Sequence, residues 1–226
     1  MQKDQATGRA SAVPTEVWDL IHQILSEVPI DFGGGCSEAK AGRIAELIID
    51  SSATLAVDIG VYRGRSFLPM GVAFKWLGSG TAYGVDPYSA IVARQTDNHE
   101  VGDVLVEWAD DQDWDAIHAQ VQAQIDEKAL SSFARLVRET SKDAASRFAP
   151  GSIDLIHIDG NHDQAAVELD YELYKRLVRP GGFIVLDDIS WGSVQSVYEA
   201  LRASSTLLEE AQGNGDDFAI FSIPGR

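Results

Sequence analysis

Two apolar segments that end in acidic residues restrict the fold of this chain more than any other feature. Residues 154–159 read Asp-Leu-Ile-His-Ile-Asp, and residues 183–188 read Phe-Ile-Val-Leu-Asp-Asp. Short apolar runs of this kind are typical of buried strands in a parallel sheet. Open α/β sheets bind ligands at the edge where the carboxyl ends of their strands meet. We therefore expect Asp159, Asp187 and Asp188 to lie together at that edge.

Three carboxylates at one edge would repel one another unless a cation or protons neutralised them. Oxygen ligands favour a hard cation such as Mg²⁺ or Mn²⁺, so we assign Asp159, Asp187 and Asp188 as metal ligands, with Mg²⁺ as the expected ion. His162 follows Asp159 by three residues and is the candidate general base, because imidazole accepts a proton near neutral pH. Helix capping is the alternative role for His162 and for Asp188.

Strand-like and helix-like segments alternate along most of the chain. The expected strands are residues 54–58, 81–86, 133–138, 153–159 and 183–187, and residues 206–211 and 217–222 are expected to form a hairpin. Helices are expected between them, including one over residues 163–178 that ends at Arg179-Pro-Gly-Gly. This alternation predicts an α/β fold with a doubly wound, mostly parallel seven-stranded sheet and a C-terminal antiparallel hairpin.

The remaining segments are interpreted as additions to a single domain over residues 14–226. Residues 1–13 are small and polar, which predicts a disordered arm. Residues 14–51 carry two helical patterns and form a helical N-terminal extension, in which Ser37 is expected to cap the second helix. Residues 89–129 are too long for a simple crossover and are interpreted as a helical insertion.

A glycine-containing turn, Asp58-Ile-Gly60-Val-Tyr-Arg-Gly64-Arg-Ser66, follows the first strand. Its two glycines allow the backbone to approach a ligand closely. The second strand ends at Asp86, where an acidic side chain can bind ribose hydroxyls. Together these features favour a cofactor that carries adenosine, with a plain tight turn and a helix-capping Asp86 as the alternative. Asp58 would repel a pyrophosphate, and the glycine spacing differs from that of dinucleotide-binding loops, which disfavours NAD.

These motifs resemble those of class I S-adenosylmethionine-dependent methyltransferases. The narrower resemblance is to the bacterial branch that includes metal-dependent sugar and macrolide O-methyltransferases. It is carried by residues 57–66 (motif I), 84–88 (Gly-Val-Asp-Pro-Tyr), 156–162 (Ile-His-Ile-Asp-Gly-Asn-His) and 181–188, and by residues 33–40 for the loop and helix before motif I. The resemblance covers about residues 30–222 and implies a Rossmann-like methyltransferase fold.

The resemblance also implies a role for each motif. S-adenosylmethionine would be held by Asp58 and Gly60 at its methionine part, with Ser66 nearby, by Asp86 at the ribose, and by Tyr88 and Ser141 near the adenine. Asp159, Asp187 and Asp188 would hold the divalent cation, and His162 falls at the position of the general base. The implied reaction is O-methylation of a small-molecule acceptor, a sugar or natural product, whose hydroxyl the metal acidifies. Residues 89–129 match nothing in the family, so acceptor choice is expected to lie there.

Net charge, cysteine count and the lengths of apolar stretches limit the partners and the compartment that we expect for this chain. A formal net charge of −17 argues against nucleic acid, whose binding depends on clustered Lys and Arg. The single Cys36 excludes an internal disulfide and fits a reducing compartment. The sequence has neither a membrane-spanning apolar stretch nor a signal peptide, so we expect a soluble, cytoplasmic protein. The apolar face of the N-terminal helical extension suggests a homo-oligomer.

Several conspicuous residues have plainer interpretations. His157 alternates with the apolar positions of its strand and is assigned a structural role, and Cys36 is assigned a packing role. Trp108, Trp114 and Trp191 are candidates for an acceptor pocket, with core packing as the alternative.

Two other functions use parts of the same pattern. A metal-dependent hydroxylase or hydrolase of small molecules would use the carboxylates without methyl transfer, and the mass of the product would distinguish it. A non-catalytic protein that binds S-adenosylmethionine would use the cofactor motifs alone.

Overall fold

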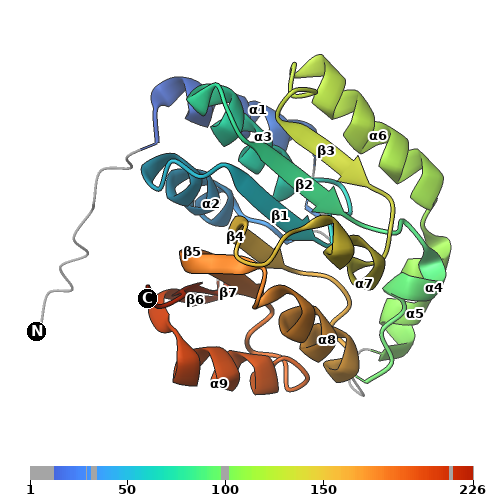
Figure 1. Ribbon diagram of the computed structural model, residues 1–226. Helices are drawn as coiled ribbons and strands as arrows, with labels where there is room; N and C mark the ends of the chain where they lie inside the picture. Colours follow the sequence, from blue (N-terminus) through green and yellow to red (C-terminus); the bar gives the residue numbers. More distant parts are fainter. Residues whose placement is uncertain (1–12, 29, 32–34, 98–101, 214–215, 226) are drawn as a thin grey trace, which may run out of the picture.

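The computed structural model describes residues 13–28, 30–31, 35–97, 102–213 and 216–225 (Figure 1). Its centre is a seven-stranded sheet with the order β3-β2-β1-β4-β5-β7-β6. The strands are β1 (Leu55–Ile59), β2 (Thr81–Val85), β3 (Ala134–Val137), β4 (Ile153–Ile158), β5 (Val178–Asp187), β6 (Thr206–Gly213) and β7 (Asp216–Ser222). Strands β1 to β5 run parallel, whereas β7 is antiparallel to both β5 and β6. The predicted fold is confirmed.

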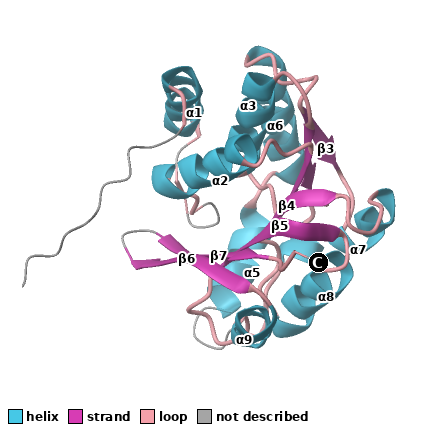
Figure 2. Ribbon diagram, turned by 60° about the vertical axis from the view of Figure 1, so that its left-hand side comes forward, coloured by secondary structure: helices cyan, strands magenta, loops and turns pink. Residues whose placement is uncertain are grey.

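Helices cover both faces of the sheet (Figures 1 and 2). One layer contains α1 (Thr15–Glu27), α2 (Glu38–Asp50), α3 (Phe67–Leu77) and α6 (Trp114–Glu127), and the other contains α7 (Ser141–Ala144), α8 (Gln164–Tyr174) and α9 (Gln195–Ser204). The short α4 (Ala90–Ala93) and α5 (Gly102–Asp111) lie beyond the carboxyl ends of the strands (Figure 1). Within the interval read as an insertion, α6 is the crossover between β2 and β3, and it buries Ile117, Val121 and Ile125.

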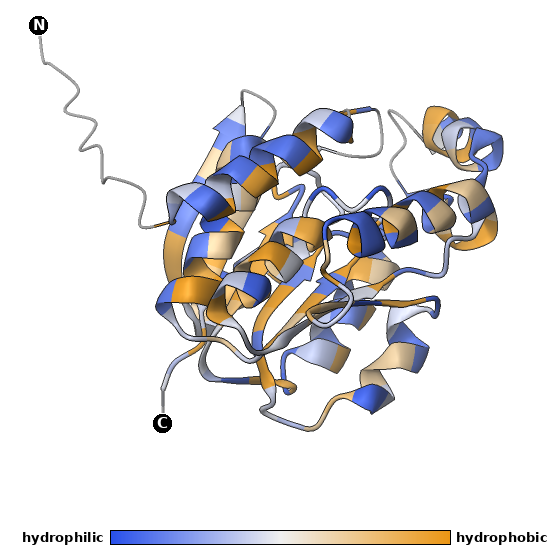
Figure 3. Cartoon of the chain, turned by 90° about the horizontal axis from the view of Figure 1, so that it is seen from above, coloured by the Kyte–Doolittle hydropathy of each residue, from blue (hydrophilic) through white to orange (hydrophobic). Residues whose placement is uncertain are grey.

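The central strands β1 and β4 are mostly apolar on both faces because helices cover both, whereas β6 at the edge of the sheet is polar and partly exposed. In β1, Ala56 packs with the α1–α2–α3–α6 layer, whereas its neighbour Val57 packs with the α7–α8–α9 layer. In β4, Leu155 and Ile156 divide in the same way. The strands in Figure 3 are accordingly mostly hydrophobic, whereas the surrounding helices mix hydrophobic and hydrophilic residues. Burial on both sides gives the continuous apolar runs from which the strands were predicted.

The boundary between α8 and β5 differs from the prediction. The helix ends at Tyr174 rather than at residue 178, and the expected turn over residues 179–182 belongs to the strand. Val178 pairs with Ile153 before the register shifts, and the Gly181 amide donates a hydrogen bond to the Ile223 carbonyl (2.8 Å). An irregularity of this kind lets a strand accommodate Pro and Gly, which the sequence pattern reads as a stop.

The N-terminal helices are fastened to the loop after β1. The buried Arg65 guanidinium donates hydrogen bonds to the carbonyls of Leu25 and Cys36, each at 2.9 Å. The Ser37 hydroxyl accepts a hydrogen bond from the Lys40 amide (3.0 Å) and caps α2 as predicted. Of the predicted arm, Val13 is buried, and residues 1–12 lie outside the described residues. No helix in the described ranges is long and apolar enough to cross a membrane.

Candidate active site

The site lies between β1 and β4, where the strand order of the sheet reverses. Strands β1 and β4 are neighbours, but successive connections lead from them toward opposite edges, and such a switch point opens a ligand crevice. Gly60 follows β1 and Asp159 follows β4, and a Cβ atom at Gly60 would lie 1.9 Å from the Asp159 carbonyl oxygen. Gly60 also has a φ of +86°. This position therefore requires glycine both for its backbone conformation and for the close approach of the two loops.

A cavity of about 700 Å³ opens over this switch point. It is lined by most of the sequence-predicted site residues: Gly60, Ser66, Asp86, Ser141, Asp159, His162, Asp187 and Asp188. Trp108, Trp114 and Trp191 also line it, and all three pack against the hydrophobic core as well, so both of their predicted roles remain open. Two predicted residues, Asp58 and Tyr88, are not among the residues that line this cavity.

The Asp86 carboxylate is held by hydrogen bonds from two backbone amides. Its Oδ2 accepts a hydrogen bond from the Tyr62 amide (2.9 Å), and its Oδ1 accepts one from the Tyr88 amide (2.7 Å). Burial raises the pKa of Asp86 above its ordinary value despite these bonds. Both tyrosines have positive φ values, 45° and 47°, so the carboxylate holds two turns in an otherwise unfavourable conformation.

Asp58 and Tyr88 lie behind the cavity wall. Asp58 is fully buried, and its carboxylate accepts a hydrogen bond from the Ser66 hydroxyl (2.9 Å) while its other oxygen lies 2.6 Å from His157 Nδ1. Tyr88 packs its ring edge-on against His118, at 4.9 Å between centroids. Asp58 is therefore linked to the cavity by its hydrogen bond with Ser66, which lines it. Tyr88 acts through its backbone amide, which donates a hydrogen bond to Asp86.

Ser141 leads to an acidic residue that the sequence analysis missed. Its hydroxyl donates a hydrogen bond to Asp170 of α8, which also lines the cavity. Burial raises the pKa of Asp170 to about 6, although the hydrogen bond from Ser141 opposes that shift. Asp170 falls within the polar stretch of a helix, so its sequence position gives no sign that its carboxyl is buried.

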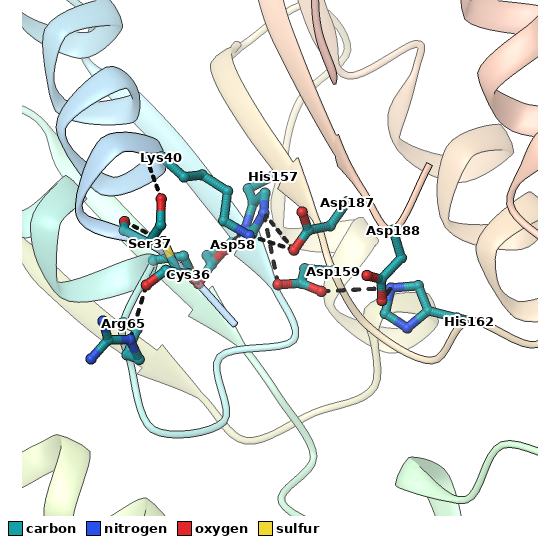
Figure 4. Close-up of polar contacts among 11 residues, drawn as sticks. Cys36, Ser37, Lys40, Asp58, Arg65, His157, Asp159, His162, Asp187 and Asp188 are labelled. Carbon is teal, nitrogen blue, oxygen red and sulfur yellow. Dashed lines mark hydrogen bonds and ion pairs between the residues drawn. The ribbon is translucent and has the colours of Figure 1, made fainter. Parts of the chain in front are cut away.

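Lys40 of α2 is a second residue that the sequence analysis missed (Figure 4). Its Nζ lies 2.5 Å from Asp187 Oδ2, and both side chains are buried. Burial by itself would raise the pKa of Asp187, but the Lys40 ammonium, His157 and a hydrogen bond with Asp159 together outweigh it and hold the pKa at about 2. Asp187 is therefore an ionised carboxylate that already has a cation beside it.

Asp159 sits between two histidines. Its Oδ2 is 3.8 Å from His157 Nε2, and its Oδ1 is 3.5 Å from His162 Nε2 (Figure 4). Loss of hydration and repulsion from Asp187 raise the pKa of Asp159 well above its ordinary value. His157 is fully buried, as its structural assignment expected, but it also joins Asp58 to this carboxylate cluster.

His162 faces the carboxylates rather than capping a helix. Its Nε2 is 3.4 Å from Asp188 Oδ2, and its Nδ1 is 3.4 Å from the Gln95 side-chain amide nitrogen. Asp163, not His162, occupies the N-cap position of α8. Within the described part of the chain, the Nε2 atoms of both His157 and His162 are buried without a hydrogen-bond partner. Loss of hydration raises the pKa of Asp188, although His162 opposes that shift.

The segment after β2 is tied to the carboxylate loop. Asn161, to which the sequence analysis gave no role, donates hydrogen bonds to the carbonyls of Val92 (2.8 Å) and Arg94 (2.7 Å). Asp163 accepts hydrogen bonds from the amides of Thr96 and Asp97. These bonds place Gln95 against His162. Cys36 also borders the cavity, and burial raises the pKa of its thiol to about 12, consistent with a packing role.

Comparison with known protein families identifies the class to which the chain belongs. A family model described as a methyltransferase domain matches residues 57–189, so the chain belongs to this methyltransferase family. It is a class I, S-adenosylmethionine-dependent methyltransferase, as the motifs predicted. No curated protein has significant sequence similarity to the chain.

Solved structures with a similar fold include three from bacteria. An O-methyltransferase from Bacillus cereus in complex with SAH has a TM-score of 0.62 and 15% identity, over 95% of this chain and 93% of that chain. TomG from Streptomyces achromogenes, an O-methyltransferase involved in tomaymycin synthesis and solved with SAM, has a TM-score of 0.61 and 14% identity, over 95% and 92%. A putative caffeoyl-CoA O-methyltransferase from Staphylococcus aureus has a TM-score of 0.60 and 15% identity, over 92% of each chain. At these identities the likeness establishes the fold.

Proposed function

We propose that this methyltransferase transfers a methyl group from S-adenosylmethionine to a hydroxyl of a small molecule, assisted by a divalent cation. One observation carries the proposal: the same cavity is lined by the glycine loop after β1 and by the carboxylates at the ends of β4 and β5. Two reactants bound in one such cavity would gain the rate advantage of proximity. The similar proteins from Bacillus cereus, Streptomyces achromogenes and Staphylococcus aureus are described as O-methyltransferases, which favours oxygen as the acceptor atom.

The cofactor would lie over the glycine loop. Gly60 and Ser66 would border its methionine part, with Asp58 orienting Ser66 from below, and Asp86 would accept from the ribose hydroxyls. Ser141 would border the adenine, near the turn that contains Tyr88. S-adenosylmethionine supplies the methyl group: its carbon–sulfur bond breaks as the new carbon–oxygen bond forms.

The carboxylate cluster fits a divalent cation by its charge. Asp159, Asp187 and Asp188 carry three negative charges when ionised, and Lys40 supplies one positive charge, which leaves two negative charges. A divalent cation would balance this remainder. Buried charges require such compensation, because their loss of hydration is otherwise costly.

The cation, when bound, would lower the pKa of the acceptor hydroxyl and orient it. Asp159 would hold the cation and accept the hydroxyl proton, since its side chain is 23% exposed whereas that of His162 is only 8% exposed. The acceptor itself would rest against Trp108, Trp114 and Trp191, which line the same cavity. An acceptor with an aromatic or otherwise apolar body fits these walls best.

The test is a calorimetric titration of S-adenosylmethionine into the protein with Mg²⁺ and again with EDTA, followed by a screen of hydroxylated small molecules for methyl gain. We expect cofactor binding under both conditions and methyl transfer only with the cation. Asp159→Asn should lower the transfer rate about 10²–10⁴-fold and leave cofactor affinity within about threefold, because Asp159 lies outside the cofactor contacts. Absence of cofactor binding under both conditions would overturn the proposal.

A further inference from the structure

We infer that the cation binds between Asp159, His162 and Asp188, with the His162 imidazole as a direct ligand through Nε2. This inference rests on the proposed function and changes the predicted ligand set in two ways. Asp187 leaves the set because Lys40 occupies it, and His162 enters it as a ligand instead of acting as the free general base.

The spacing of the three side chains suits one ion. His162 Nε2 lies 3.5 Å from Asp159 Oδ1 and 3.4 Å from Asp188 Oδ2. Two atoms that each bind one ion at about 2.1 Å, with an angle between tetrahedral and octahedral, are about 3.0–3.4 Å apart. The two separations from Nε2 are therefore within a few tenths of an ångström of this range, and the ligand atoms of all three side chains lie within 4.8 Å of one another. Among the described residues, the His162 Nε2 atom makes no hydrogen bond to either carboxylate.

The environment of Nε2 distinguishes a ligand from a general base. The His162 side chain is 8% exposed, and among the described residues its Nε2 is buried without a hydrogen-bond partner. A base must touch the hydroxyl from which it takes a proton. This atom instead faces two carboxylates, where a cation would satisfy it and neutralise them.

Lys40 explains why the neighbouring group of possible ligands is a poorer site. His157, Asp159 and Asp187 also bring ligand atoms close together. However, Lys40 Nζ lies 2.5 Å from Asp187 Oδ2 and would repel a dication placed there. The His157 Nε2 atom also lies farther from its carboxylates, at 3.8 Å from Asp159 Oδ2 and 3.9 Å from Asp187 Oδ2. The ammonium thus directs the ion to the side of Asp159 on which His162 and Asp188 lie.

Gln95 supplies the support that a metal-binding histidine needs. Its side-chain nitrogen lies 3.4 Å from His162 Nδ1, and its Oε1 is buried without a partner among the described residues. Turning this amide by 180° exchanges the two atoms, so that Oε1 accepts a hydrogen bond from Nδ1–H. Nε2 then presents its lone pair to the ion, in the tautomer that metal-binding histidines adopt. Gln95 is therefore a positioning residue that belongs to the segment between α4 and α5.

The mixed ligand set favours a borderline metal. Carboxylates alone suit Mg²⁺, but an imidazole nitrogen shifts preference toward Mn²⁺, Co²⁺ or Zn²⁺. The probe for the experiment is Mn²⁺ alone, titrated calorimetrically into metal-stripped full-length protein and observed by pulsed electron paramagnetic resonance. We expect the spectrum of bound Mn²⁺ to contain a coupling to one imidazole nitrogen.

The variants separate the possible ligands. His162→Ala should weaken Mn²⁺ binding about 10–100-fold and remove the nitrogen coupling, whereas His162→Asp should regain affinity through oxygen and narrow the preference for Mn²⁺ over Mg²⁺. His22→Gln is the matched control, because His22 is an exposed histidine of α1. Gln95→Leu should weaken Mn²⁺ binding about tenfold and Gln95→Glu should restore it. Thermal unfolding verifies that each variant is folded.

Two results would overturn the inference. Mn²⁺ binding that is unchanged in folded His162→Ala would return His162 to the role of base. A nitrogen coupling that survives in His162→Ala but disappears in His157→Gln would move the ion to the Asp187 side. In either case, cofactor binding and methyl transfer by the native protein would leave the proposed function intact, whereas loss of cofactor binding by the native protein would refute the function itself.

Discussion

The two halves of the cavity differ in how completely the chain satisfies its own polar groups. On the cofactor side, both Asp86 oxygens accept backbone hydrogen bonds, and both Asp58 oxygens contact Ser66 or His157. On the carboxylate side, the buried Nε2 atoms of His157 and His162 are without hydrogen-bond partners in the described residues and lie 3.4–3.9 Å from Asp159, Asp187 and Asp188. The first half is preorganised, and the second is complete only with an added positive charge.

This difference shows how to distinguish a binding surface from a site for an ion. A surface that receives a neutral or weakly charged ligand can be fully hydrogen-bonded beforehand. A cation site contains carboxylates whose negative charges no group of the protein neutralises. These charges destabilise the protein until the ion binds. Three substitutions test this contrast, in decreasing order of expected effect.

Lys40→Met should cause the largest loss of stability. Removing the ammonium leaves Asp187 as a buried charge without its partner, which costs about 3–5 kcal/mol. Urea unfolding in the presence of a chelator measures this loss. The double variant Lys40→Met/Asp187→Asn should recover most of it, because the unpaired charge is then absent. If the single variant is as stable as the native protein, the carboxylate side does not depend on Lys40 and the contrast fails.

Asp170→Asn tests a buried carboxylate on the cofactor side whose charge is neutralised by a proton rather than by a cation. The pKa of Asp170 is raised from 3.8 to about 6, so the folded protein binds this proton more tightly than the unfolded chain does. Its contribution to stability is therefore present below about pH 4 and is lost as the pH rises to about 6.

Asparagine carries no titrating proton. The change in the free energy of unfolding between about pH 4 and pH 6 should therefore be smaller in Asp170→Asn than in the native protein, by up to about 3 kcal/mol. Chemical unfolding at a series of pH values measures the slope. An unchanged slope would mean that Asp170 titrates normally and that its burial does not favour the protonated form.

Asp86→Asn should weaken S-adenosylmethionine binding about 30-fold, or about 2 kcal/mol, because a charged acceptor becomes a neutral one. Calorimetry on the native and variant proteins measures the change. Mn²⁺ affinity should stay the same, since Asp86 belongs to the preorganised half. A parallel fall in Mn²⁺ affinity would indicate that the two halves respond as one unit.

Local patterns in the sequence were sufficient to predict the sheet and the acidic edge. Apolar runs identified the strands, and the three carboxylates were located because they stand at strand ends: Asp187 is the last residue of β5, and Asp159 and Asp188 directly follow β4 and β5. Gly60 and Asp86 were found for the same reason, since a turn and a strand end are both local features. The start of β5 was missed because Pro180 and two glycines usually end an element.

The remaining site residues depend on contacts between distant parts of the chain. Lys40 meets Asp187 across 147 positions, and no periodicity records such a pair. Gln95 lies in a polar segment that acquires its place only through the hydrogen bonds of Asn161 and Asp163. His157 looked structural because a buried strand position is apolar by default, and its contact with Asp58 requires both strands to be in register.

The missing side chain at position 60 has a consequence for the reaction itself. Because the loop after β1 rests directly on the Asp159 carbonyl, the loop proposed to hold the cofactor and the loop proposed to hold the cation touch through their backbones. The added methyl group of Gly60→Ala would push the two loops apart by more than an ångström. We therefore expect this substitution to slow methyl transfer by increasing the distance between the two reactants.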